Sequence, residues 1–86
     1  MLLEFGAPWC GHCQAAQPAI RLLLGDQPRL EPLKLEDGRD EPPGRPFRVM
    51  LWPTLVLLRN SQQLARVVRP LSDADLLPLR KAQAAL

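Results

Sequence analysis

The feature that most constrains this chain is a pair of cysteines three positions apart, Cys10 and Cys13, placed between two different hydrophobic patterns. Residues 2–5 before the pair are apolar except for one acid, as expected of a strand buried on both faces of a sheet. Residues 14–24 after the pair carry alanines and leucines at helical spacing. The thiols therefore lie where a strand turns into a helix, and the N-terminus of a helix lowers the pKa of a thiol.

The remaining chain predicts three more strands and a second helix. Alternating or wholly apolar runs mark the strands, at residues 30–36, 55–58 and 64–68. Pro32 lies in the first of these runs and cannot donate to a sheet hydrogen bond, so that strand is expected at an edge. Residues 59–62 predict a hairpin turn, and the strand after it is expected at another edge. Because a helix joins the first two strands, they should be parallel.

Local signals predict where the two helices begin, bend and end. Pro18 lies inside the first helix and should kink it, and Gly25 is expected to cap its C-terminus. Ser72 and Asp75 resemble a capping box at the start of the second helix. Pro78 lies too deep in that helix for a first-turn proline and should kink or shorten it.

Length and composition limit the classes of function. We expect one small domain, 1–86, in which a stretch rich in Pro, Gly and charge, 37–46, is a loop and 47–51 a helical turn. The net charge of +2 comes from scattered Lys and Arg residues, so no nucleic acid partner is expected, and no apolar run is long enough to span a membrane. No secretory signal is visible, and we expect a cytoplasmic protein. Paired cysteines there more often serve redox chemistry or metal binding than a structural disulfide.

Two motifs in this chain resemble those of a known family. The run WCGHC at residues 9–13 resembles the active site of protein disulfide isomerase domains, and WPT at residues 52–54 resembles the cis-proline loop of the thioredoxin superfamily. The match also takes in Glu4, Pro18 and Lys34, and so covers essentially the whole chain. The resemblance implies an α/β chain of minimal thioredoxin-like fold, with a four-stranded mixed sheet, element order β-α-β-β-β-α, and helices packed on the sheet.

The chain departs from that family at three places. It lacks the strand and helix that open a full thioredoxin, which fits the expected edge position of residues 30–36. Gly6 stands where thioredoxins usually carry a tryptophan. Arg69 stands where a glycine normally lets the substrate approach the cis-proline loop. The last two differences leave the choice of substrate open.

The two cysteines carry the expected chemistry. Cys10 would meet unpaired N–H groups and the positive end of the helix dipole, which favour its thiolate and make it the attacking sulfur. Cys13, one turn later, is close enough to resolve a mixed disulfide. One alternative is a structural disulfide, although so short a loop would stabilise little. Another is a zinc site, although a closed site needs four ligands and only His12 accompanies the two cysteines.

Three further side chains are expected to assist the cysteines. His12, partly positive near neutral pH, would favour the Cys10 thiolate, or it is a solvated loop residue. In the family a histidine here goes with more oxidising domains than a proline does. Glu4 resembles the buried acid that takes a proton from the resolving Cys13, with an exposed strand acid as the alternative. Lys34 would be the charge partner of Glu4 on the adjacent strand, or a solvated edge lysine.

The resemblance also implies a substrate-binding surface. Pro53 would follow a cis peptide bond and would hold the backbone of Trp52 ready to pair with an extended substrate segment beside Cys10. Trp9 and Trp52 would form the apolar rim of that surface. Alternatively, either tryptophan belongs to the core.

Together these residues predict a thiol–disulfide oxidoreductase that reduces or isomerises protein disulfides, with no bound cofactor or metal. Its partners would be disulfide-containing proteins and, as electron donor, a dithiol reductase or glutathione. One alternative is a non-catalytic thioredoxin-like binding module that docks a partner through the cis-proline groove or an edge strand. Another is a redox or metal sensor built on the two cysteines and the histidine between them.

Overall fold

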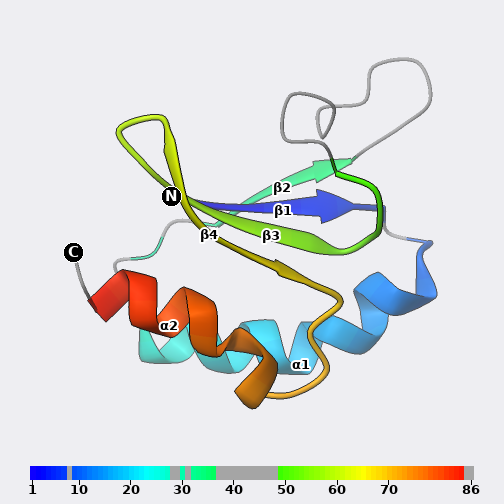
Figure 1. Cartoon of the computed structure of the whole chain (residues 1–86). Helices are drawn as coiled ribbons and strands as arrows, with labels where there is room; N and C mark the ends of the chain where they lie inside the picture. The colour runs from blue at the N-terminus through cyan, green and yellow to red at the C-terminus, as the bar shows by residue number, and fades with distance from the viewer. Residues whose placement is uncertain (8, 28–29, 31, 37–48, 85–86) are drawn as a thin grey trace.

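The strands and helices of the computed structural model follow the order that the hydrophobic patterns predict. The structure describes residues 1–7, 9–27, 30, 32–36 and 49–84 (Figure 1). The elements are β1 (Leu2–Gly6), α1 (Gly11–Asp26), β2 (Pro32–Glu36), β3 (Thr54–Arg59), β4 (Gln62–Val68), a short 3₁₀ turn η2 (Ala74–Leu76) and α2 (Leu77–Ala84). The predicted loop at 37–46 lies outside the described residues, as do the first two residues of the predicted turn at 47–51. Residues 49–51 are not helical.

The strands form one mixed sheet in the order β2-β1-β3-β4. β1 pairs parallel with β2 and antiparallel with β3, and β3 pairs antiparallel with β4. The two most apolar runs are therefore the central strands, and the strand that contains Pro32 lies at an edge, as predicted. The register sets Glu4 of β1 beside Lys34 on one neighbour and beside Leu55 on the other. The expected α/β fold with a parallel first pair of strands is confirmed.

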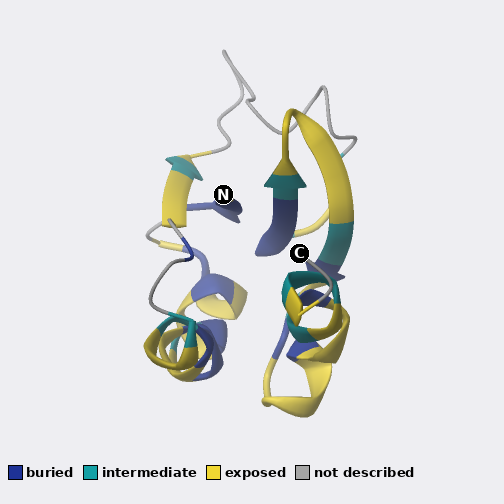
Figure 2. Cartoon of the chain, turned by 90° about the vertical axis from the view of Figure 1, so that its left-hand side faces the viewer, coloured by how far each residue is buried: buried dark blue, intermediate teal, exposed yellow. Residues whose placement is uncertain are grey.

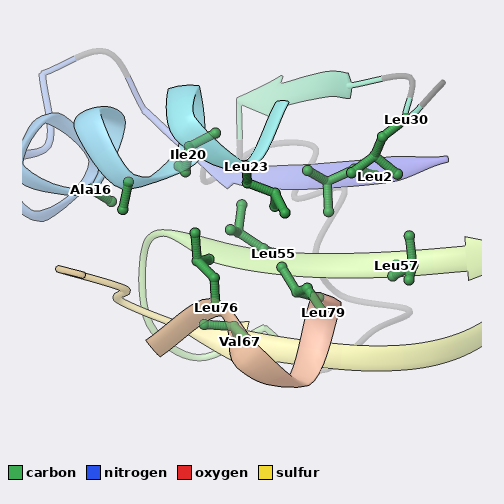
Figure 3. Packing of buried hydrophobic residues seen from close by; sticks show 11 residues of the cluster. Leu2, Ala16, Ile20, Leu23, Leu30, Leu55, Leu57, Val67, Leu76 and Leu79 are labelled. Carbon is green, nitrogen blue, oxygen red and sulfur yellow. The ribbon is translucent and has the colours of Figure 1, made fainter. Parts of the chain in front are cut away.

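Both helices lie on the same face of the sheet, below it in Figure 1. The main core lies between these helices and the sheet (Figure 3). Its buried side chains are Leu2, Ala16, Ala19, Ile20, Leu23, Leu30, Leu55, Leu57, Val67, Leu76 and Leu79. The alternate side chains of the central strands form a smaller buried cluster, Leu3, Phe5 and Val56. Figure 2 shows the consequence: β1 and the start of β3 are buried, whereas β2 is largely exposed.

The turn between β3 and β4 is the predicted hairpin. Asn60 and Ser61 have positive φ values of 52° and 65°. Two consecutive residues of this kind are typical of a type I′ turn, whose twist matches that of the flanking strands. The hairpin brings the end of β4 back to the start of β3, where Thr54 is opposite Val68.

The first helix extends further than its glycine predicts. α1 continues through Gly25 to Asp26, and the N–H of Gln27 donates to the carbonyl of Leu23 at 3.0 Å. The expectation that Gly25 caps the helix is wrong, because its backbone does not take the positive φ of a glycine cap. Pro18 lies inside the helix as predicted. No helix in the described ranges is long and apolar enough to cross a membrane.

The second helix begins later than predicted. The N–H of Asp75 donates to the carbonyl of Ser72 at 3.1 Å, and the Asp75 carboxylate accepts from the N–H of Leu71 at 3.0 Å. In a capping box the Asp75 carboxylate would accept from the N–H of Ser72. It accepts instead from the N–H of the preceding residue, Leu71. Pro78 is the second residue of α2, because the turn before it is the 3₁₀ segment. The proline thus occupies a first turn, where its missing N–H costs no helical hydrogen bond.

Candidate active site

Cys10 and Cys13 lie at the start of α1, where the chain leaves β1. Cys10 is the N-cap residue of α1, and its N–H donates to the carbonyl of Ala7 at 3.1 Å. The N–H of Cys13 donates to Sγ of Cys10 at 3.4 Å, so this sulfur takes the capping position that an oxygen usually fills. Both thiols are free, with exposed fractions of 8% for Cys10 and 5% for Cys13. The helix start therefore directs backbone amides at the first sulfur.

The pKa of the Cys10 thiol is lower than usual. Burial is the largest single influence on this pKa and acts in the opposite direction, because it favours the neutral thiol. It is outweighed by hydrogen bonds with the side chain and backbone of Cys13 and the backbone of His12, together with the positive charge of Arg69. These are the interactions that a helix N-terminus and a nearby cation offer to a thiolate. Cys10 is thus the sulfur that ionises first.

The pKa of the Cys13 thiol is raised to about 11, chiefly by burial. A hydrogen bond with Cys10 and the negative charges of Cys10 and Glu4 raise this pKa further, while the backbone of Ala7 lowers it. An ionised neighbour makes a second ionisation costly. The two sulfurs therefore differ in chemistry: Cys10 ionises at a lower pH than an ordinary thiol, and Cys13 ionises at a higher one.

We expect iodoacetamide to alkylate Cys10 at pH values where an ordinary thiol is unreactive. Only the thiolate reacts, so a lowered pKa moves the half-maximal rate to a lower pH than that of an ordinary cysteine thiol. Cys13 should reach its half-maximal rate only near pH 11. Peptide mapping by mass spectrometry follows both cysteines in one reduced sample. A Cys10 midpoint at or above that of free cysteine would show that the helix start does not activate it.

A cavity of about 350 Å³ adjoins the second sulfur. Its lining includes Glu4, Gly6, Cys13, Gln17 and Lys34. A Cβ built on Gly6 would lie 2.6 Å from Sγ of Cys13, which is closer than real contacts allow. The family resemblance leads one to expect a tryptophan at position 6. The glycine found there leaves room for the Cys13 sulfur and for the cavity beside it.

Gly6→Ala should destabilise the reduced protein by about 1–3 kcal/mol, the usual cost of overpacking a buried site. In a Cys13→Ala background this cost should nearly vanish, because the next atoms, Cβ of Cys13 and Cβ of Trp52, lie at 3.8 and 3.9 Å. Urea unfolding of the parent, both single variants and the double variant gives the coupling energy. The backbone of Gly6 has no positive φ, so alanine adds no backbone strain. Equal costs in both backgrounds would contradict the contact with the sulfur.

Gln17 lies between Glu4 and Lys34 and links them. Its Nε2 donates to Oε2 of Glu4 and to the carbonyl of Cys13, each at 3.1 Å, and its Oε1 accepts from Nζ of Lys34 at 3.3 Å. Glu4 is only 8% exposed, so the alternative of an exposed strand acid is wrong. Lys34 is exposed and reaches Glu4 through Gln17. Sequence reasoning missed Gln17, although its position four residues after Cys13 places both on one helix face.

Trp9 and Trp52 form an apolar surface beside the cysteines, and the side chain of Pro53, next to Trp52, is fully buried. The Trp52–Pro53 peptide bond is cis, as the resemblance implies. The rings of Trp9 and Trp52 pack edge to face, with centroids 5.4 Å apart and an interplanar angle of 71°. Trp9 is 71% exposed, so it does not belong to the core, while Trp52 is half-buried and packs against the cysteine pair. The two rings therefore form an apolar surface next to the cysteine pair.

Arg69 follows β4 and turns back onto the segment that contains the cis bond. Its N–H donates to the carbonyl of Pro53 at 2.9 Å, and its Nε donates to the carbonyl of Trp52 at 2.8 Å. Its φ is 51°, a conformation that is uncommon outside glycine. The backbone thus retains a conformation suited to the glycine that the family carries, while the side chain adds a positive charge that lowers the pKa of Cys10.

The histidine between the cysteines is exposed. The influence of His12 on the pKa of Cys10 comes through its backbone N–H. In the ranges that the structure describes, no three His, Cys, Asp or Glu side chains gather closely enough to hold a metal ion.

The chain is similar to known proteins over most of its length. A family model described as Thioredoxin matches residues 1–81. The thioredoxin of Chlamydia muridarum is 34% identical over 75 residues, which cover 87% of this chain and 72% of that protein. The protein disulfide-isomerase of Hordeum vulgare is 36% identical over 66 residues, 70% of this chain and 13% of that protein. The structure of reduced thioredoxin 2 from Pseudomonas aeruginosa matches with a TM-score of 0.86 at 46% identity, covering 99% of this chain and 80% of that one.

These matches extend over most of the chain, and the span of the family model includes the helix start that carries Cys10 and Cys13. We conclude that the chain belongs to the thioredoxin family and is a thiol–disulfide oxidoreductase.

Proposed function

We propose that Cys10 attacks the disulfide of a protein substrate and that Cys13 resolves the resulting mixed disulfide. In the first step the Cys10 thiolate forms a bond to one substrate sulfur, and the other sulfur leaves as a thiolate that takes a proton from water. In the second step Cys13, once deprotonated, attacks Sγ of Cys10. The Cys10–Cys13 disulfide forms, the substrate is released as a dithiol, and two electrons have passed from the protein to the substrate. The observation that carries this assignment is the contrast between the two sulfurs: Cys10 accepts the helix N–H at 3.4 Å and has a lowered pKa, while the pKa of Cys13 is raised.

Glu4 is proposed to take the proton from Cys13. It is the buried carboxylate whose charge acts on the Cys13 thiol, and the cavity beside it is large enough to admit water. Gln17 would hold the Glu4 carboxylate in place by donating to it, and Lys34 would supply a positive charge at the outer end of the same chain of hydrogen bonds. The proton accepted by Glu4 would leave through the water of the cavity.

Trp9 and Trp52 are proposed to receive an extended segment of the substrate, and the buried Pro53 to hold the backbone of Trp52 in place for it. The exposed ring of Trp9 and the half-buried ring of Trp52 offer apolar contact next to the nucleophile. An extended peptide can pair with backbone groups of the segment at Trp52. His12, exposed on the first turn of the helix, is proposed to favour the Cys10 thiolate and so to make the dithiol more oxidising.

The working compartment decides the direction of exchange. We propose a cytoplasmic protein, in which a dithiol reductase or glutathione returns the Cys10–Cys13 disulfide to the dithiol. A potential near that of protein disulfide isomerase, about −180 mV, lies above the cytosolic glutathione poise of about −220 to −260 mV. The dithiol would then stay reduced, and the protein would reduce or reshuffle substrate disulfides.

Equilibration with a series of glutathione buffers tests this proposal. The dithiol fraction, trapped by alkylation and measured by mass spectrometry, should give a potential near about −180 mV. The variant His12→Pro removes both the imidazole and the backbone N–H that bonds to Cys10, and should shift the potential toward about −270 mV, the value of thioredoxin. His12→Ala keeps the N–H and isolates the contribution of the imidazole. Turnover of insulin disulfides with dithiothreitol or with glutathione then identifies which class of donor sustains the cycle. A parent potential at or below that of thioredoxin would restrict the protein to strong reductase duty, and absence of turnover with both donors would refute the proposed cycle.

A further inference from the structure

Arg69 places an unpaired positive charge where the substrate approaches the nucleophile. Its guanidinium donates one hydrogen bond, from Nε to the Trp52 carbonyl. An arginine has five N–H donors, so four remain for another partner. No carboxylate in the described part of the chain pairs with Arg69, since the ion pairs found there join Arg80 to Asp26 and to Asp73.

The position of Arg69 is held by the fold. Two hydrogen bonds, one from its backbone to the Pro53 carbonyl at 2.9 Å and one from its side chain to the Trp52 carbonyl at 2.8 Å, tie it to the surface beside Cys10. Its side chain is close enough for its charge to act on the Cys10 sulfur. A guanidinium that is already oriented loses little conformational freedom when it binds a second group.

We propose that Arg69 is an anion subsite of the substrate surface, so that the protein prefers disulfides with an Asp or Glu carboxylate beside the reacting cysteine. This inference rests on the proposed function, because it names the substrates of the same site. Arginine pairs with carboxylates through two parallel hydrogen bonds, which fix geometry as well as charge. The Nε bond leaves the terminal amino groups of the guanidinium available for such a pair.

Two physical arguments favour acidic substrates over neutral ones. A carboxylate next to a disulfide repels the Cys10 thiolate, and a cation placed beside both removes that repulsion. In addition, the Trp52 carbonyl already accepts one hydrogen bond from Arg69, on the segment that is proposed to pair with an extended substrate. A side-chain carboxylate can bind the free donors of Arg69 without displacing this bond. The departure from the family's glycine therefore adds a recognition element to a surface that otherwise recognises the peptide backbone.

Two disulfide peptides that differ only in Asp or Asn next to each cysteine test the proposal. The rate constant for their reduction by the reduced protein should favour the Asp peptide by about five- to tenfold at low ionic strength. This preference should fall as salt is added. Because a change in the pKa of Cys10 alters both rates alike, the ratio of the two rates reports recognition alone.

The variants separate recognition from structure and from net charge. Arg69→Gln should abolish or reverse the preference, and Arg69→Lys should keep part of it. Arg69→Gly should also lose the preference while folding at least as well as the parent, because glycine accepts the φ of 51° without strain. Arg59→Gln removes the same charge from the exposed far end of β3 and should keep the full preference. A parent with equal rates for both peptides, or an Arg69→Gln variant with an undiminished ratio, overturns the subsite. A parent that reduces neither peptide refutes the proposed function itself.

Discussion

Cys10→Ser is expected to bring disulfide reduction to the background rate, whereas Cys13→Ser should complete the first step and hold the substrate as a mixed disulfide. The pKa of Cys10 is lowered by the helix amides and by Arg69, and this thiolate is the nucleophile. A serine hydroxyl there cannot form a disulfide, so the loss should be about 1,000-fold or more, the scale seen when an enzyme loses its nucleophile. In Cys13→Ser the attack still occurs, but no second sulfur is present to release the product.

The two variants are measured in parallel. Insulin reduction with dithiothreitol gives the turnover of each protein, and mass spectrometry of the intact protein after mixing with a disulfide peptide detects the adduct. Only Cys13→Ser should accumulate an adduct, and it should be located on Cys10. Equal turnover in the parent and both variants would contradict catalysis by this pair and would favour the alternative of a non-catalytic binding module.

Glu4→Gln should slow the resolving step by about 100-fold, the lower end of the range for loss of a general base, and should leave the first attack unchanged. The pKa of Cys13 is about 11, so near neutral pH this thiol needs a base before it can attack. The substitution also removes the negative charge that helps to raise this pKa. Burial is the larger cause of the shift, however, so the loss of the base should dominate.

The pH dependence distinguishes a lost base from a general disturbance. A mixed disulfide between Cys10 and a peptide is formed beforehand, and its resolution is followed by stopped-flow fluorescence. The rates of the parent and Glu4→Gln should converge as the pH approaches 11, where Cys13 ionises without help. Asp26→Asn removes a carboxylate charge from the exposed far end of α1, outside the cavity, and serves as the control, with no slowing expected. Gln17→Ala should act in the same direction as Glu4→Gln but more weakly, because it loosens the carboxylate without removing it. A constant ratio of rates across the pH range would argue against Glu4 as the base.

Much of the fold could be predicted from local patterns. The apolar run at 55–58 predicted a central strand, and Pro32 predicted an edge strand, because each pattern reports on burial or hydrogen bonding of a single segment. The helix ends were predicted less well. Gly25 lies inside α1, and Pro78 lies in the first turn of α2 rather than deep within it. A preceding 3₁₀ turn changes where a helix begins, and the sequence pattern of an α-helix does not distinguish the two.

Some residues of the candidate site could also be predicted from the sequence, and others could not. The motif and its resemblance predicted the cysteine pair, the buried Glu4 and the two tryptophans. In the structure, Glu4 and the tryptophans lie near the two sulfurs. Gln17 was missed because its importance depends on how α1 is rotated against β1 and β2. The bond from Arg69 to Trp52 was also missed, because it joins residues that are 17 positions apart. Neither contact leaves a local pattern in the chain.

By itself, the sequence determined the order of strands and helices and the placement of two thiols at the start of a helix. Both depend on interactions within a few residues: alternation, turn chemistry and the unpaired amides of a helix N-terminus. Only the tertiary structure decided that Gln17 stands between Glu4 and Lys34, that Gly6 makes room for the Cys13 sulfur, and that the Arg69 side chain donates to the Trp52 carbonyl. These arrangements arise where side chains from separate elements meet, and their geometry is set by the packing of helices against the sheet.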